Sequence, residues 1–379
     1  MRVLVTTTGA AGHFNPLVPF ARALVDAGDE VLVATRTWTA PTVERAGFAT
    51  WTYDETPAEV RDAFFAQASE LPPDEMNALV IRELFARRDV QAALPRVREA
   101  IETWRPDLVL HESGELAGPT AAELAGLPNV SVMITLGSSE LKFLDPALEG
   151  IAPVREELGL PFEVRPFSAT FTLFPLSIED PELPGPPGVR RFREELPPAG
   201  ELPDWWPGND DPLVYVTFGS VAADFGTFPF LFDAALRHLA PLPVRLLVTT
   251  GRNTDLSLLA DVPANARVEQ WVAQADVTPH ASVIVCHGGS GTVRDGLAGG
   301  VPLVVVPLFA DQPYNAARVQ ASGAGIALPP RDQGFPRLAD AVREVLGQPR
   351  YKARAAEIAA DNAALPPVSD AVEILHALI

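Results

Sequence analysis

The stretch from Trp271 to Gln312 constrains the fold of this chain more than any other part of the sequence. Within it, residues 282–286 form a short apolar run typical of a buried parallel strand. A glycine-rich turn over 287–292 follows at once, and a helical pattern begins near Val293. A strand, a glycine turn and a helix in this order direct backbone N–H groups and the positive end of the helix dipole at one point. That arrangement suits a phosphate or a diphosphate.

Aromatic and polar residues at both ends of this stretch indicate further ligand contacts. Trp271 lies in an expected turn, where its flat indole can stack on a nucleobase, and Gln274 follows it. Asp311 and Gln312 come after the expected strand 303–306, at the strand end where open α/β sheets bind ligands. An acid and an amide there can hydrogen-bond sugar hydroxyls, so the stretch offers partners for a base, a diphosphate and a sugar.

Taken together, these residues resemble the donor-binding signature of the family 1 glycosyltransferases, which use nucleotide sugars. The closest likeness is to bacterial enzymes that glycosylate macrolides and other natural products. The resemblance covers essentially the whole chain and implies the α/β fold called GT-B. In that fold, two Rossmann-like, doubly wound domains face each other across a cleft.

The resemblance gives each part of the stretch a role in binding the donor. It implies that Trp271 stacks on the base and that Gln274 lies near the base or the ribose. Asp295 takes the family's ribose-binding acidic position, where Glu is common, and Asp311 and Gln312 would hold the sugar hydroxyls. The residues expected around the diphosphate are Ser220, His287, Gly288, Gly289, Ser290, Gly291 and Thr292.

The N-terminal part of the chain contains another βα unit, with the candidate base next to its turn. An expected strand over 2–7 precedes the turn 8–13, and a helix is expected over 16–27. The turn is G-x-x-G rather than G-x-G-x-x-G, and no acid ends the next strand over 30–34, which disfavours a dinucleotide site. His13 matches the family's general base, and imidazole suits that role because its ordinary pKa is ~6.5.

A base of this kind needs a carboxylate to orient it. The resemblance places an acid at the end of the expected strand 107–110, and Glu112 is the candidate. Related bacterial enzymes often carry Asp at this place. His111 and Glu115 remain alternatives at the same strand end.

The reaction implied by the resemblance is an inverting transfer from a UDP- or dTDP-linked sugar to a hydrophobic small molecule. The pair Asp311-Gln312 accompanies ordinary hexose donors, which favours UDP-glucose. The helix terminus at 288–292 would stabilise the leaving diphosphate, so we expect neither a metal nor a cofactor. Apolar residues of the helical segment 55–104 suit either a helix core or a wall for the acceptor. They are Phe64, Phe65, Met76, Phe85 and Trp104.

Two other functions share part of this pattern. A nucleotide-sugar epimerase of the same fold would need no acceptor and would convert the donor alone. A non-catalytic helper protein would bind the nucleotide sugar without turnover, and the combination of His13 with Asp311-Gln312 disfavours it.

The density of proline between Pro181 and Pro212 predicts an interdomain linker without regular structure. We therefore expect an acceptor-binding domain over 1–205 and a nucleotide-sugar-binding domain over 206–364. The resemblance implies that a helix within 365–379 packs back on the first domain. A chain of 379 residues with 47% hydrophobic residues is ample for two cores.

Composition limits the partners of the chain. A formal net charge of −20 and a pI near 4.7 argue against nucleic acid and anionic membrane surfaces. No apolar run reaches the ~18 residues of a spanning helix, and the start is too short and too polar for a signal peptide. The single cysteine, Cys286, excludes an intrachain disulfide. We expect a cytoplasmic monomer or homodimer that binds neither nucleic acid nor membranes.

Overall fold

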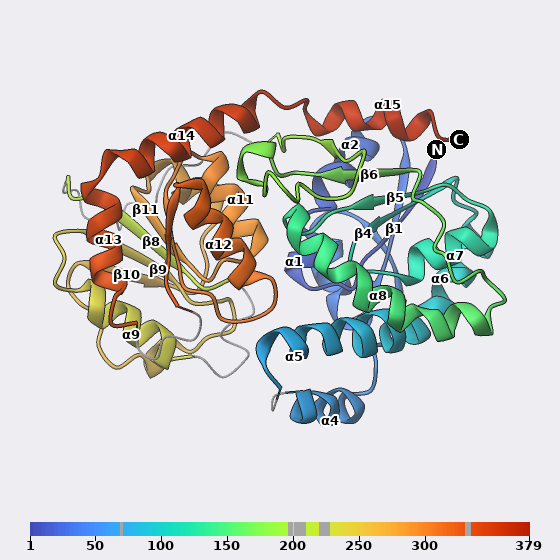
Figure 1. Ribbon diagram of the computed structural model, residues 1–379, viewed down its shortest axis with the longest axis horizontal. Helices are drawn as coiled ribbons and strands as arrows, with labels where there is room; N and C mark the ends of the chain where they lie inside the picture. The colour runs from blue at the N-terminus through green and yellow to red at the C-terminus, as the bar shows by residue number, and fades with distance from the viewer. Residues whose placement is uncertain (69–70, 196–199, 201–209, 220–227, 330–334) are drawn as a thin grey trace. The chain divides into compact units, whose positions relative to one another are not determined.

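The chain forms two compact units, each built on a parallel sheet (Figure 1). Unit 1 comprises Met1–Leu173, Pro181–Glu195 and Pro366–Ile379, and unit 2 comprises Phe174–Asp180 and Leu196–Leu365. The computed structural model describes residues 1–68, 71–195, 200, 210–219, 228–329 and 335–379.

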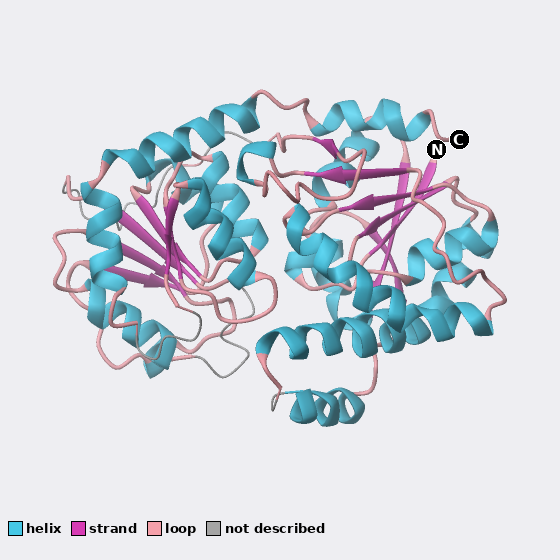
Figure 2. Ribbon diagram, in the orientation of Figure 1, coloured by secondary structure: helices cyan, strands magenta, loops and turns pink. Residues whose placement is uncertain are grey.

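A seven-stranded sheet forms the centre of unit 1 (Figure 2). Its strands are β1 (Arg2–Thr6), β2 (Glu30–Arg36), β3 (Ala49–Tyr53), β4 (Leu108–Glu112), β5 (Asn129–Val132), β6 (Ala169–Thr172) and β7 (Arg190–Arg191). Their order is β3-β2-β1-β4-β5-β6-β7, and all neighbours are parallel. The order reverses between β1 and β4, so the carboxyl ends of these two strands form the switch point at which such sheets bind ligands.

Unit 1 contains nine α-helices among its described residues, and several of them cover the two faces of the sheet. The nine helices are α1 (Ala11–Phe14), α2 (Val18–Asp26), α3 (Ala40–Arg45), α4 (Ala58–Ala68), α5 (Pro73–Leu79), α6 (Val90–Trp104), α7 (Ala117–Ala125), α8 (Gly137–Glu157) and α15 (Ala371–His376). Other helical elements are η1 (Thr37–Thr39), the π-helical η2 (Val80–Asp89) and η7 (Val368–Asp370). Because strand residues alternate between faces, Val3 and Val5 pack with α2 and α15, whereas Leu4 packs with α6 and α7.

The last residues of the chain complete the core of unit 1. Val368, Ala371, Val372 and Leu375 are buried in the same cluster as residues of β1 and α2. The backbone of Arg193 bonds to both Pro366 and Val368, at 2.9 and 3.1 Å. The C-terminal helix α15 therefore belongs to unit 1, which also contains the first residues of the chain.

Unit 2 has a six-stranded parallel sheet in the order β10-β9-β8-β11-β12-β13. The strands are β8 (Leu213–Thr217), β9 (Arg245–Thr249), β10 (Ala266–Glu269), β11 (Val283–Cys286), β12 (Leu303–Val305) and β13 (Gly325–Ala327). Its switch point lies between β8 and β11, so the turn after β11 occupies the position expected of a ligand site.

The helices of unit 2 are α9 (Phe230–Leu239), α10 (Gln274–Val277), α11 (Ser290–Ala298), α12 (Gln312–Ser322), α13 (Leu338–Gly347) and α14 (Pro349–Ala363), with the short η3 (Leu176–Ile178), η5 (Leu256–Leu258) and η6 (Thr278–His280). Val216, Val285 and Val304 pack with α9 and α13 in the main core. Across the described parts of both units, no helix has the length and apolar character needed to cross a membrane.

The proline-rich region differs from its sequence prediction. Residues 181–195 belong to unit 1 and include β7, although no regular structure was expected there. Phe174–Asp180 belongs to unit 2, although the prediction placed it in the domain 1–205. Arg318 holds this segment through the carbonyl oxygens of Ile178 and Glu179, at 3.3 and 2.7 Å. The rest of the predicted linker, 196–199 and 201–209, lies outside the described residues.

Candidate active site and donor-binding site

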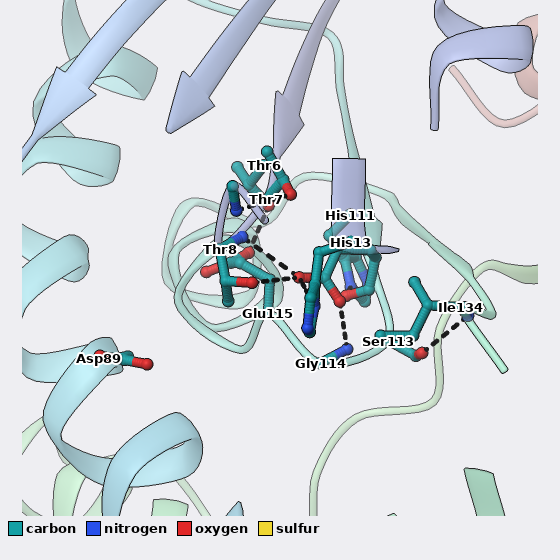
Figure 3. Close-up of polar contacts among 12 residues, drawn as sticks. Thr6, Thr7, Thr8, His13, Asp89, His111, Ser113, Gly114, Glu115 and Ile134 are labelled. Carbon is teal, nitrogen blue, oxygen red and sulfur yellow. Dashed lines mark hydrogen bonds and ion pairs between the residues drawn. The ribbon is translucent and has the colours of Figure 1, made fainter. Parts of the chain in front are cut away.

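A histidine and a glutamate meet at the switch point of unit 1. His13 lies on α1, just after β1, and Glu112 is the last residue of the neighbouring strand β4. The Nδ1 atom of His13 lies 2.9 Å from Oε1 of Glu112. Figure 3 shows His13 close to Gly114 at this strand end. The Glu112 side chain is fully buried, whereas 19% of the His13 side chain is exposed. The pair therefore combines a buried carboxylate with an imidazole that solvent can reach.

Three further donors hold the Glu112 carboxylate in place. Its Oε1 accepts from the backbone N–H and the hydroxyl of Thr8 at 3.2 and 3.1 Å, and its Oε2 accepts from the N–H of Gly114 at 2.6 Å. Burial alone would raise the pKa of Glu112, but His13 and these hydrogen bonds outweigh it, so the pKa lies below its ordinary value. A Cβ at Gly114 would stand 3.0 Å from Glu112 Oε2 and 3.2 Å from His13 Cε1, which favours glycine there.

The two alternatives to Glu112 are engaged elsewhere. The His111 ring is buried against Phe167, its Nδ1 lies 3.1 Å from the Glu112 carbonyl oxygen, and burial lowers its pKa to about 4. Glu115 accepts hydrogen bonds from the Thr6 hydroxyl and from two N–H groups of α7, and burial raises its pKa to about 7. Among the three candidates, Glu112 is the residue that the structure pairs with His13.

One residue of the segment 55–104, Phe85, lies next to His13. Phe85 of η2 lies edge-on to His13, with ring centroids 5.8 Å apart. The same ring packs in a small cluster with Phe64 and Leu84. Asp89, at the end of η2, bonds to Arg36 and Thr56. Phe85 therefore packs in this small helical cluster and borders His13, and the role of the segment as a wall for the acceptor stays a prediction.

The predicted phosphate turn follows β11, as expected. Gly289 caps α11, and Gly291 and Thr292 lie in the first turn of that helix, next to Ser290. The His287 ring packs against the backbone of Gly219 and Gly289, and burial lowers its pKa to about 4, which keeps it neutral near pH 7. Ser220, the other predicted contact of the diphosphate, lies outside the described residues.

A hydrogen-bonded network joins this turn to the predicted sugar-binding residues. The hydroxyl of Ser290 donates to Oδ2 of Asp311 at 2.7 Å, and the amide of Asn315 reaches both residues. The side-chain Oε1 of Gln312 instead accepts from the N–H groups of Leu308 and Phe309, at 2.9 and 3.0 Å. Gln312 therefore also shapes the loop before α12, a role that the sequence did not suggest.

Trp271, predicted to stack on the nucleobase, and Asp295, predicted to bind the ribose, both lie in unit 2. Trp271 is 52% exposed, and the Arg252 guanidinium covers its ring with 3.8 Å between Cζ and the ring centroid. Asp295, predicted at the ribose, accepts hydrogen bonds from Arg294 at 2.9 Å and from Gln274, predicted near the base or the ribose, at 3.4 Å. Arg252 was not anticipated, because its only sequence signal is that it follows the expected strand 244–249 by three residues.

Comparison with known proteins shows which proteins this chain resembles. The family described as erythromycin biosynthesis protein CIII-like, C-terminal domain, matches residues 235–378. The L-demethylnoviosyl transferase of Streptomyces niveus is 33% identical, over 100% of this chain and 98% of that protein.

Two solved structures are similar over nearly the whole chain. The Streptomyces sp. SF2575 glycosyltransferase SsfS6, complexed with thymidine diphosphate, has a TM-score of 0.81 and 28% identity, over 99% of each chain. The spinosyn rhamnosyltransferase SpnG, complexed with spinosyn aglycone, has a TM-score of 0.83 and 26% identity, over 99% of this chain and 100% of that chain. These similarities confirm the predicted fold class, two α/β domains with parallel sheets in the GT-B arrangement.

Proposed function

The chain belongs to the natural-product glycosyltransferases of the GT-B fold, and we propose that His13 is the general base with which it transfers a sugar from a nucleotide sugar to a small molecule. The activity class is that of the relatives, inverting sugar transfer. The observation that carries the proposal for His13 is its 2.9 Å contact with the buried Glu112 carboxylate.

The pairing with Glu112 sets the chemistry of the imidazole. When Nδ1–H donates to the carboxylate, the lone pair resides on Nε2, which is then the atom that accepts a proton. In the proposed step, Nε2 of His13 takes the proton of an acceptor hydroxyl, and that oxygen attacks the anomeric carbon. In this single displacement, the bond from this carbon to the diphosphate breaks as the new bond forms on the opposite face, so the configuration inverts. The Glu112 carboxylate stabilises the imidazolium that forms.

The donor-binding roles rest on the turn after β11 and on Trp271. The N–H groups at the start of α11, together with the dipole of that nine-residue helix, favour the charge that grows on the leaving diphosphate. The neutral His287 ring supplies one further polar contact. Asp311 and Gln312 are proposed to hold the sugar, and Asp295 with Gln274 the ribose.

Donor and acceptor identities are proposed at the level of chemical class. We propose a UDP- or dTDP-linked hexose as donor and a hydrophobic natural product as acceptor. The thymidine diphosphate of SsfS6 supports the dTDP form, and the spinosyn aglycone of SpnG supports a small-molecule acceptor. The cytoplasmic location and the monomeric or homodimeric state stay predictions.

Incubation with a panel of donors and acceptors, followed by mass spectrometry, tests the proposal. A new mass of acceptor plus one hexose or deoxyhexose is the expected result. Conversion of a donor in the absence of any acceptor would instead indicate an epimerase. Tight binding without turnover over the whole panel would indicate a helper protein.

We also propose that the transfer needs no metal. Added EDTA should leave the initial rate within about twofold, because the start of α11 takes the electrostatic role that a divalent ion has in other transferases. The rate would be measured at saturating donor before and after chelation. A loss that only Mg²⁺ or Mn²⁺ restores would contradict this prediction.

Replacing Trp271 with alanine should weaken nucleotide binding. The indole is proposed to cover one face of the base, and such stacking contributes roughly 1–3 kcal/mol per base. Calorimetry with UDP and dTDP measures the effect. Trp38 is a matched control, since it is 56% exposed and belongs to unit 1. An unchanged affinity in Trp271→Ala, or an equal loss in Trp38→Ala, would remove the stacking role.

A further inference from the structure

Asn315 lies in the first turn of α12 and is fully buried. Its Nδ2 atom lies 2.9 Å from the carbonyl oxygen of Gly288, 3.0 Å from Oγ of Ser290 and 2.9 Å from Oδ2 of Asp311. The Ser290 hydroxyl gives its own hydrogen to Asp311, so all three neighbours can act as acceptors. These neighbours fix the orientation of the amide, because only its nitrogen can donate, and its two N–H groups serve the three acceptors with one hydrogen shared between two of them.

We propose that Asn315 is a positioning residue for the donor, which locks the phosphate turn and the Asp311 carboxylate into one rigid unit. The inference rests on the proposed function, in which the turn holds the diphosphate and Asp311 holds the sugar. Asn315 itself is assigned no contact with the substrate. Its effect reaches the donor through Gly288, Ser290 and Asp311.

The need for such a link follows from the way the site is built. The turn follows β11, whereas Asp311 precedes α12, so the two parts come from segments about twenty residues apart in the sequence. The two segments touch closely, since a Cβ at Gly288, where φ is +88°, would stand 2.7 Å from Val305 Cγ1 and 3.1 Å from the Gln312 carbonyl oxygen. Within this contact, the Asn315 amide bonds to both segments at once. Small errors in the placement of a reacting group are costly, so this link affects catalysis as well as binding.

Asn315→Ala tests the proposal, with Asn265→Ala as its matched control. The Asn265 amide donates to the carbonyl oxygens of Leu242 and Val244 in the same unit, at 3.3 and 3.0 Å, just before β10. Both changes remove one buried or half-buried amide, so both should lower the melting temperature. Asn315→Ala alone should raise the donor KM about tenfold and lower kcat/KM for the donor by about 10- to 100-fold, with the acceptor KM unchanged.

Asn315→Asp is the second variant, because it keeps the side-chain volume. Its carboxylate would face three acceptors, so the same donor defect is expected, and it should be larger at pH 8 than at pH 6. At lower pH, protonation of the introduced carboxyl group restores one hydrogen-bond donor and removes a negative charge beside Asp311.

The binding readout is calorimetry with UDP, dTDP and the donor that the wild-type enzyme uses. The expected loss of affinity is larger for the sugar nucleotide than for UDP or dTDP, since only the sugar nucleotide needs both parts of the site. A folded Asn315 variant with wild-type donor KM and affinity would overturn the positioning role. So would an equal donor defect in Asn265→Ala. Absence of both binding and transfer in the wild-type protein would refute the proposed function instead.

Discussion

Replacement of His13 by alanine should lower kcat by a factor on the order of 10²–10⁴ for an acceptor with an ordinary hydroxyl. The imidazole is the proposed proton acceptor, and its partner Glu112 is already buried and held by three other hydrogen bonds. Steady-state kinetics at saturating donor measures the effect. The donor KM should barely change, because the proposed donor residues belong to unit 2 and His13 belongs to unit 1.

Three comparisons make this test specific. Glu112→Gln should cause a smaller loss, because Glu112 orients His13 and stabilises its charged form without taking the proton. The loss in His13→Ala should shrink for an acidic phenol or a thiol, which needs less help to lose its proton. His280→Ala, which changes an exposed histidine of η6, should behave like the wild type. Near-normal turnover of His13→Ala on a simple alcohol would require another base.

Replacement of Arg155 by alanine should lower the free energy of unfolding of unit 1 by about 3–5 kcal/mol. Arg155 of α8 is only 2% exposed. Its guanidinium makes two contacts with the Glu123 carboxylate of α7, at 2.8 and 3.2 Å, and donates to the carbonyl oxygens of Pro161 and Glu163. The truncation would leave a largely buried carboxylate and two carbonyl groups without their donor. Urea unfolding followed by circular dichroism measures the loss.

Two variants separate the charge from the packing. Arg98→Ala changes an exposed arginine of α6 and should stay within about 0.5 kcal/mol of the wild type. The double change Arg155→Met with Glu123→Leu should recover much of the stability, since removal of both charges avoids an unpaired buried ion. A loss below about 1 kcal/mol in Arg155→Ala would mean that water reaches Glu123 once the guanidinium is gone.

The order of strands and helices was largely predictable, because each βα unit has its own local signal. The apolar run 282–286 became β11, and the pattern after the glycine turn became α11. The edge strand β7 was not predictable, since Arg190–Arg191 has no apolar alternation and its pairing depends on distant residues. The place of Phe174–Asp180 in unit 2 was not predictable either, since Arg318, which donates hydrogen bonds to this segment, lies about 140 residues further along the chain.

The candidate site was predictable by residue type, but the details of orientation were not. His111 and Glu112 are neighbours in β4, and strand side chains alternate in direction, so a single residue of register decides which one meets His13. The contact between Asn315 and Asp311 could have been predicted from their spacing in the sequence. The helix begins at Gln312, and a spacing of four places Asn315 beside Asp311. The bonds of Gln312 to Leu308 and Phe309 reflect a tight loop whose path the sequence does not reveal.

The interleaving of the two units also bears on how the protein is made and recombined. Unit 1 needs Val368, Ala371 and Leu375 for its core, yet the ribosome delivers these residues only after all of unit 2. The first unit to be synthesised is therefore the last to be completed, so nascent chains carry an unfinished N-terminal core throughout translation. A chimera that joins two relatives at the proline-rich segment must take residues 366–379 from the same parent as residues 1–173.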